Sequence, residues 1–280
     1  MYPERLENDR SCDYFFDDEF FNGKFNFVHV YLHGNYKYMM HSHQFYEINL
    51  VASGEGMHYI ENSRLETVTG DVFVIPPEIR HGYFSEERLD IYHILIKKDF
   101  LARYSEELEE IEGFHLLFDF EPRIRQSSGK EINLNVGYGE LSAFQGELEK
   151  MMAVEKSRRY VYLNALTLAF ICRLCKRISR AVSLSGEGEI VRVMEYINAN
   201  LEGKITLEGL CAQAHISAAT LNRRFRAAVG TSPMDYVLAA RIARARAFLE
   251  EGTLSRTEIA QACGFYDLAH MNKYVKPTKP

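Results

Sequence analysis

The first third of the sequence carries side chains that can bind a polar ligand. His41, His43 and Glu47 lie within a stretch of seven residues, and His81 follows further along the chain. Imidazole and carboxylate groups form hydrogen bonds and also bind transition metals. Because alternate residues of a β-strand share one face, His41, His43 and Glu47 can all point into the interior of a barrel. These four residues are therefore candidates for a binding site.

Other polar aromatic residues occur in the same part of the chain, namely His29, Tyr31, His33, His58, Tyr59, Tyr92 and His93. Such side chains suit a sugar or similar polyol, because hydroxyl groups need hydrogen-bond partners and C–H faces stack on rings. We predict a pocket for a small-molecule effector, with ligand-binding residues His29, Tyr31, His41, His43, Glu47, His81 and His93. The alternative for each of these residues is a position at the surface, or a position in the core where its hydrogen bonds are made within the protein.

Short strands are predicted to carry the candidate pocket. Runs rich in β-branched and aromatic residues cover 25–33, 46–52, 56–61, 71–75 and 91–97. Many short strands at close spacing, separated by Gly and Asn turns, favour an antiparallel barrel or sandwich. From residue 99 the pattern becomes helical, with an extended segment expected over 115–125 and helices over 139–154 and 160–181. The last of these has a continuous apolar stripe, which packs either on the barrel or on a second copy of the chain.

The second group of functional residues lies in Ile205–Arg226, ITLEGLCAQAHISAATLNRRFR. This stretch predicts a helix, a tight turn and a second helix, and no acidic residue lies between Ser217 and Val229. A basic second helix of this kind is typical of a helix-turn-helix, in which it enters the major groove of DNA.

The outward face of this second helix predicts the contacts to DNA. Ala218 and Ala219 can make apolar contacts to thymine methyls, Asn222 suits adenine, and Arg223 suits guanine. Arg226 is better placed for phosphate. Arg224 lies on a flank, as either a phosphate contact or a surface charge.

The helix-turn-helix sequence is repeated further along the chain. Residues 210–216 match 259–265 at an offset of 49, and residues 221–225 match 271–275 at an offset of 50. The DNA-binding residues of the second unit are then Ala269, Asn272, Lys273 and Lys276. A connecting helix from Pro233 to about Glu250 would span roughly 27 Å. Two recognition helices could then lie about one turn of DNA apart, roughly 34 Å.

The composition supports this division of the chain. Residues 186–280 hold 12 Lys and Arg against 10 Asp and Glu, whereas residues 1–185 hold 21 against 29. Only the back half therefore has the charge of a polyanion-binding domain.

The five scattered cysteines, the polar N-terminus and the lack of a long apolar run predict a cytoplasmic protein with reduced thiols and no membrane segment.

The front half resembles the cupin fold. HSHQFYEINLVASG has the form HxHxxxExxxxxxG, and GDVFVIPPEIRH resembles the second cupin motif, with Glu78 where Gly is usual. In metal-dependent cupins the matching residues, here His41, His43, Glu47 and His81, hold a divalent metal, and this ligand set would suit Fe, Mn, Ni or Zn. Related sensor barrels use such residues as hydrogen-bonding groups without metal. We therefore expect a small-molecule effector and no cofactor, with the metal as the alternative.

The back half resembles the AraC family of bacterial transcription regulators. The matching segments are YINANLEGKITLEGL, SxxxLxRxF ending at Phe225, PxxYxxxxR ending at Arg241, and EIAxxxGFxD ending at Asp267. The match departs near the end of the chain, where Lys273 replaces an Arg, Val275 replaces a Phe, and the sequence stops at KPTKP without the family's closing helix. This departure predicts a less well packed second unit with weaker DNA contacts.

The sequence therefore predicts an α+β chain in three parts. Residues 1–120 form a cupin-like sensing barrel, 121–184 a helical dimerisation or connecting segment, and 185–280 an all-α double helix-turn-helix domain. The resemblance implies a ligand-responsive regulator, commonly of carbohydrate-use genes, that binds paired DNA half-sites as a homodimer and can act on RNA polymerase. The alternatives are a cupin metalloenzyme with a helical appendage and a dimer-forming modulator that has lost DNA binding.

Overall fold

The computed structural model describes residues 13–21, 25–34, 40–122, 125, 134–185, 188–229 and 231–275. The predictions on Lys276 and on the final residues of the chain lie outside this described part. The chain divides into two compact units, residues 1–181 and 182–280, and each unit is described by itself. The predicted class is confirmed, with a curled β-sheet and helices in the first unit and helices alone in the second.

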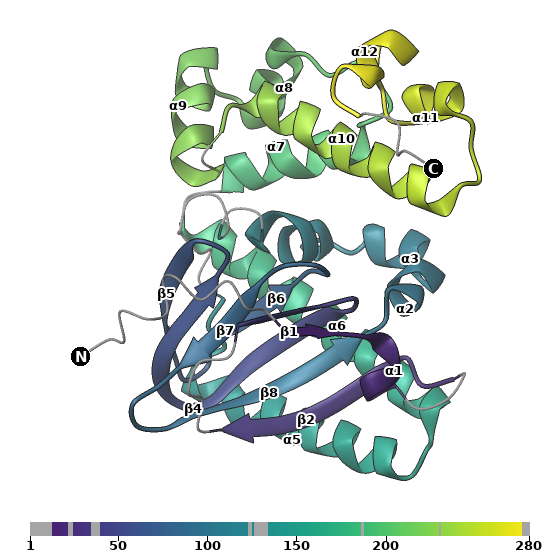
Figure 1. Cartoon of the computed structure of the whole chain (residues 1–280). Helices are drawn as coiled ribbons and strands as arrows, with labels where there is room; N and C mark the ends of the chain where they lie inside the picture. Colours follow the sequence, from purple (N-terminus) through teal and green to yellow (C-terminus); the bar gives the residue numbers. More distant parts are fainter. Residues whose placement is uncertain are drawn as a thin grey trace. The chain divides into compact units, whose positions relative to one another are not determined.

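The first unit is built on a sheet of eight described strands (Figure 1). They are β1 (Asp13–Phe15), β2 (Val28–Gly34), β3 (His41–His43), β4 (Tyr46–Ile60), β5 (Ser63–Val68), β6 (Val72–Ile75), β7 (His81–Phe84) and β8 (Leu89–Ile96). The sheet has the order β1-β3-β7-β4-β8-β2, and β5 and β6 pair with other parts of β4. β1 pairs with β3 in parallel, and the other ladders are antiparallel.

The long strand β4 lets the sheet curl around its own interior. Its first half pairs with β6 and β8, and its second half pairs with β5 and β7. The register shifts between Val51 and Ser53, and Gly54 follows with φ +89°. A Cβ at Gly54 would lie 1.8 Å from the carbonyl oxygen of Arg88, so only glycine fits this close approach. The sequence predicted two strands here, and the bend at Gly54 joins them into one.

Apart from α1, which lies between β1 and β2, the described helices of the first unit follow the sheet in the chain. They are α1 (Asp17–Phe20), α2 (Lys98–Arg103), α3 (Ser105–Glu109), α5 (Gly137–Lys156) and α6 (Tyr160–Ser185). The prediction of an extended segment over 115–125 is wrong in its described part, because Leu116–Phe120 forms a π-helix. Leu116, Leu117, Phe118 and Phe120 are all buried, and a short apolar run of this kind does not distinguish strand from helix by its pattern.

α5 and α6 bury apolar stripes within the first unit. In α5 the buried residues Leu141, Phe144, Leu148, Met151 and Val154 recur at spacings of three and four. Phe144 packs edge-on against Phe170 of α6, with ring centroids 5.6 Å apart. α5 also lies beside β2, because Glu155 accepts hydrogen bonds from Val30 N (3.0 Å) and His29 Nδ1 (2.7 Å). Much of the apolar surface of these helices therefore belongs to the core.

The second unit consists of six described helices (Figure 1). They are α7 (Gly188–Ala199), α8 (Leu207–Ala214), α9 (Ala218–Val229), α10 (Pro233–Glu251), α11 (Arg256–Ala262) and α12 (Leu268–Asn272). Side-chain caps begin several of them, with Thr206 accepting from Gly209 N and Asp267 accepting from His270 N. Leu221, Phe225 and Val229 are buried on one side of α9, as predicted.

Candidate functional site

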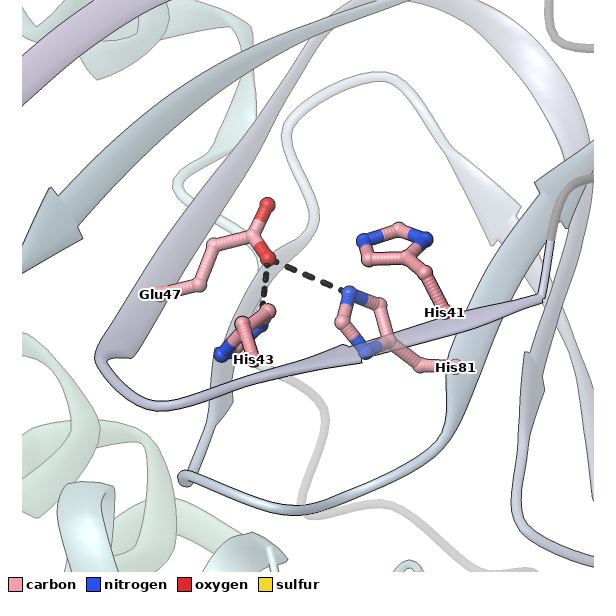
Figure 2. A group of neighbouring side chains, drawn as sticks. All are labelled: His41, His43, Glu47 and His81. Atoms are coloured by element: carbon pink, nitrogen blue, oxygen red, sulfur yellow. Dashed lines mark hydrogen bonds and ion pairs between the residues drawn. The ribbon is translucent and has the colours of Figure 1, made fainter. Parts of the chain in front are cut away.

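The strand register brings the four candidate residues of the first unit together. His41 in β3 lies opposite His81 in β7, and His43 is on the same face of β3 as His41. A tight turn after His43 leads into β4, where Glu47 points back toward the histidines. Figure 2 shows the side chains of His41, His43, Glu47 and His81 converging on one point. His43, Glu47 and His81 are buried, and His41 is half-buried.

Glu47 lies at the centre of the cluster. Its Oε2 atom is 2.9 Å from His43 Nε2 and 3.1 Å from His81 Nε2, the contacts drawn as dashed lines in Figure 2. Its other oxygen, Oε1, accepts a hydrogen bond from His93 Nδ1. The neighbouring histidines hold the pKa of the Glu47 carboxyl well below its ordinary value, His93 most strongly, although burial acts in the opposite direction. Glu47 is therefore a buried carboxylate.

The four residues are suitably placed to hold a metal ion. One ligand atom from each of His41, His43, Glu47 and His81 lies within 4.8 Å of the others, the only such group in the described part of the chain. The set would supply three imidazole nitrogens and one carboxylate oxygen, which suits a first-row transition metal. In the cupin fold such an ion would polarise or bind an oxygen-bearing ligand.

Glu78 stands at the position where the second cupin motif usually has glycine. Its φ of +68° lies in the left-handed region, which favours the glycine usual at this position. The backbone N–H of Glu78 donates to the carbonyl oxygen of His43 at 2.9 Å, so the turn supports a residue of the cluster. The Glu78 carboxylate also accepts a hydrogen bond from Tyr14 Oη at 2.7 Å, a contact that glycine could not make.

A pocket of about 590 Å³ opens over the cluster. Most of the predicted ligand-binding residues line it, namely His29, Tyr31, His41, His43, Glu47 and His93, together with His33. Tyr31 pairs with His93 across the β2–β8 ladder, and the two rings stack with centroids 4.7 Å apart. His81 is fully buried beneath the pocket and contributes only through the cluster. His58, Tyr59 and Tyr92 do not line it.

Sequence reasoning missed the apolar wall of the pocket. Phe15 of β1, Phe20 of α1, and Leu95 of β8 line it together with Phe45 and Tyr83. The aromatic run at residues 13–21 was the available signal, but its position depends on the parallel pairing of β1 with β3. Non-local pairing of this kind has no periodicity that a sequence would reveal.

In the second unit, α9 presents the predicted DNA-reading face. Ala218, Ala219, Arg223 and Arg226 are exposed, and Asn222 is half-buried. Asn222 Nδ2 donates to the carbonyl oxygen of Ala218 at 2.9 Å, so a base contact would have to replace or share this bond. The face combines small apolar residues with two exposed guanidinium groups and has the composition of a major-groove reader.

Two other arginines of this unit form contacts within the protein. Arg224 Nη2 lies 2.9 Å from Glu189 Oε2 of α7, which favours a structural role for this flanking residue. Arg241 donates from Nε to the carbonyl oxygen of Leu201 at 3.0 Å and from Nη2 to that of Gly203 at 2.7 Å. Arg241 therefore stabilises the turn after α7. Its guanidinium group is used within the protein, so fewer arginines of α10 are available to contact DNA than the sequence suggests.

The second helix-turn-helix has a shorter recognition helix. Ala269, Asn272 and Lys273 are exposed in or just after α12, which covers five residues. Arg256 donates to Asn272 Oδ1 at 2.6 Å and to the carbonyl oxygen of Val275 at 2.7 Å. A core of Ile259, Cys263, Phe265, Met271 and Val275 supports this unit.

Comparison with known sequences agrees with both halves of this description. The sequence model for the AraC-like ligand binding domain matches residues 27–134, and that for a helix-turn-helix domain matches residues 210–278. The transcriptional activator RhaR of Enterobacter sp. strain 638 is 26% identical over 231 residues, 81% of this chain and 79% of the relative. RhaR of Cronobacter sakazakii is 28% identical over 231 residues, with 81% and 78% covered. RhaS of Salmonella schwarzengrund is 25% identical over 237 residues, with 83% and 81% covered.

Among solved structures, ToxT from Vibrio cholerae O395 aligns with 90% of this chain and 93% of its own, at 11% identity and a TM-score of 0.36. Because this TM-score is low, the family assignment rests on the two domain matches alone.

The curled sheet with its pocket and the helix-turn-helix domain define a ligand-binding transcription regulator. The relatives are activators of transcription, so the alternative of a cupin metalloenzyme is set aside. The chain belongs to the AraC family of transcription regulators. None of the helices in the described part has the length and apolar character that a membrane span requires.

Proposed function

We propose that this chain is a sugar-responsive activator of transcription that binds paired DNA half-sites as a homodimer. The observation that carries the DNA-binding part is the exposed face of α9, with Arg223 and Arg226 free of acidic neighbours on that helix. The matched relatives are named transcriptional activators, which favours activation over repression. An activator of this class would act on RNA polymerase at the promoter.

The pocket supports a sugar as the effector. The stacked rings of Tyr31 and His93 offer a flat surface to the C–H face of a pyranose, and Phe15, Phe20 and Leu95 add apolar lining to the pocket. The imidazoles of His29 and His41 also line the pocket and add hydrogen-bonding groups for hydroxyls. A ligand that orders these elements would shift the population of the state that is competent to activate transcription.

The outer face of α6 supports the homodimer. Val161, Ala165, Ala169 and Cys172 lie one above another along the helix, and all four are exposed, Val161 by 87%. This face is small and apolar, whereas the opposite side of α6 is buried in the first unit. Two such helices could approach closely across a twofold axis.

A binding titration tests the proposed function. The full chain is titrated against a 30–40 bp duplex selected by the wild type from random DNA, with and without each member of a monosaccharide panel. We expect specific binding that one sugar alters at least fivefold, the lower range of allosteric coupling. Tyr31→Ala should abolish the sugar response and retain DNA binding. Failure to select any duplex would instead favour the DNA-binding-impaired modulator.

The dimer is tested separately by sedimentation. Val161→Glu places a charge on the proposed contact face and should shift the chain to monomers, whereas Val68→Glu, on an exposed strand position, should not. A wild type that sediments as a monomer at micromolar concentration would contradict this part of the proposal.

A further inference from the structure

We infer, building on the proposed sugar effector, that the ligand of the pocket is a glycoside with an apolar aglycone, the group attached at the anomeric carbon. An aromatic ring or a similarly compact apolar group fits best. A free monosaccharide would fill only part of the site and act as a weak effector. The size of the pocket, the state of its polar groups and the continuity of its apolar lining support this ligand class.

The pocket is larger than a monosaccharide, with a volume of about 590 Å³. A hexose has about twelve non-hydrogen atoms. Even at the roughly 30 Å³ that each water molecule takes in the liquid, they would occupy no more than about 360 Å³. Covalent bonds draw the atoms of a sugar closer together than this. The remaining space therefore accommodates a second group of the size of a benzene ring.

Several polar side chains of the pocket already form hydrogen bonds within the protein. Both oxygens of Glu47 are bonded to neighbouring histidines. Both ring nitrogens of His43 are engaged, Nδ1 with the carbonyl oxygen of Phe45 at 2.8 Å and Nε2 with Glu47. Nδ1 of His29 lies 2.7 Å from Glu155. Because each hydroxyl that is buried without a partner loses its hydrogen bonds to water, the pocket favours a ligand that is polar on one part only.

A contiguous apolar cluster lines another part of the pocket. Its members that line the pocket are Phe15, Phe20, Tyr31, Phe45 and Leu95. Phe20 meets Phe15 edge-on with ring centroids 5.7 Å apart, and it meets Phe45 in the same way at 5.5 Å. Phe15 and Phe20 are only half-buried, so their rings offer apolar surface to a ligand. Covering this surface with an apolar group removes it from water and is favourable.

Tyr31 joins the sugar-stacking surface to the apolar cluster. Its ring stacks on His93 with centroids 4.7 Å apart and ring planes 11° apart, and it also packs against Phe45 and Leu95. The surface proposed for the sugar therefore continues directly into the apolar lining. A ligand that uses both surfaces must carry its apolar group directly on the sugar, as a glycoside does.

The test is isothermal titration calorimetry on the full chain with matched ligands. The probes are the methyl and phenyl glycosides of D-glucose, D-galactose, D-mannose and L-rhamnose in both anomeric forms, together with phenol. We expect one phenyl glycoside to bind about 10–100-fold more tightly than the methyl glycoside of the same sugar and anomer, because the ring buries additional apolar surface. Phenol alone should bind more weakly than that glycoside, because it lacks the sugar.

Three variants locate the aglycone. Phe20→Ala removes a half-buried ring of the cluster and should reduce the preference for the phenyl over the methyl glycoside to less than about threefold. Tyr31→Ala removes the ring that both parts of the ligand share and should weaken the binding of both glycosides. Phe16→Ala is the matched control, because Phe16 is 51% exposed and does not line the pocket. It should leave both affinities unchanged, and circular dichroism verifies that each variant folds.

The possible failures distinguish the ligand class from the proposed function. Equal binding of the phenyl and methyl glycosides by the wild type would overturn the inference and leave a sugar effector in place. Phenol that binds as tightly as the best phenyl glycoside, or no binding by any glycoside of the panel, would overturn both. A phenyl preference that persists unchanged in Phe20→Ala would overturn the placement of the aglycone against the apolar cluster.

Discussion

Arg224 of α9 and Glu189 of α7 form an ion pair, with 2.9 Å between Nη2 and Oε2. The pair directs one of the three arginines of the recognition helix toward the protein and leaves Arg223 and Arg226 exposed. The sequence alone left Arg224 as either a phosphate contact or a surface charge. The structure therefore separates the exposed arginines, which we propose read DNA, from Arg224, whose side chain contacts α7.

The first prediction concerns the stability that this pair contributes. Both side chains are about one-third exposed, so solvent screens the interaction. Arg224→Ala should lower the free energy of unfolding by only about 0.2–1 kcal/mol. Urea unfolding of the single variants and of the double variant with Glu189→Ala gives the coupling directly. A coupling well above 1 kcal/mol would show that the pair is less screened than its exposure indicates.

The second prediction concerns Gly264, where the second helix-turn-helix meets the turn after α7. Its φ is +72°, and a Cβ there would lie 2.0 Å from the Leu201 carbonyl oxygen and 2.8 Å from Arg241 Nη2. Gly264→Ala should therefore destabilise the domain by roughly 2–4 kcal/mol, from the backbone conformation and the clash together.

Gly252 provides the matched control for this substitution. Its φ is +67°, but a Cβ there would meet nothing within 4 Å. Gly252→Ala should cost only the conformational part, roughly 1–2 kcal/mol. Thermal unfolding of both variants measures the cost of the clash as the difference between their losses of stability. Equal losses would mean that the close contact with Leu201 does not destabilise Gly264→Ala.

The third prediction concerns a buried ion pair of the first unit. The Arg125 guanidinium donates to both oxygens of Glu121 and to the carbonyl oxygen of Val74, and both residues are buried. Burial raises the pKa of Glu121 although Arg125 acts to lower it. Arg125→Met leaves the carboxylate without its partner and should cost about 3–5 kcal/mol. The double variant with Glu121→Leu should recover much of that loss.

A surface pair gives the comparison for Arg125. Arg88 is 74% exposed and pairs with Asp90, so Arg88→Met should cost less than about 1 kcal/mol. Similar losses for Arg88→Met and Arg125→Met in urea unfolding would contradict the dependence on burial.

The fourth prediction is a loss of stability in mildly acidic solution. His58 is fully buried against Tyr83, and burial, followed by the charge of Arg125, holds its pKa well below the ordinary value of 6.5. The unfolded chain therefore takes up this proton before the folded chain does. Stability is fully present above about pH 6.5 and falls as the pH drops below it, by up to about 1.4 kcal/mol per pH unit for one proton.

The substitution His58→Phe tests the source of that pH dependence. Neither ring nitrogen of His58 has a hydrogen-bond partner among the described residues, so an apolar ring should cost little at pH 7. Urea unfolding between pH 5 and 7 should show a slope reduced by up to one proton relative to the wild type. An unchanged slope would assign the effect to other groups, including His81, whose pKa burial also lowers.

Local patterns in the sequence predicted much of this structure. The spacing of Leu221, Phe225 and Val229 is a property of one helix, and it predicted both the core side and the outward side of α9. The alternation of His41 and His43 likewise predicted a shared face. Both inferences needed only residues close together in the chain.

Features that depend on distant strands could not be predicted in this way. The bond from His93 to Glu47 follows from the pairing of β8 with β4, and the apolar wall at Phe15 follows from the pairing of β1 with β3. The sequence contains the residues but not the register that brings them together. The left-handed turn at Glu78 is a related case, because its contacts to His43 and Tyr14 become visible only in the fold.

The most direct test of the central claim compares Arg223→Ala with Arg224→Ala in binding to the selected 30–40 bp duplex at fixed salt. If α9 reads DNA as described, Arg223→Ala should weaken specific binding by about 1–3 kcal/mol and relax sequence preference at one position, while unfolding stability stays unchanged. Arg224→Ala, whose side chain pairs with Glu189, should bind almost as tightly as the wild type. Equal affinity of Arg223→Ala and the wild type, or a larger loss for Arg224→Ala, would contradict the account.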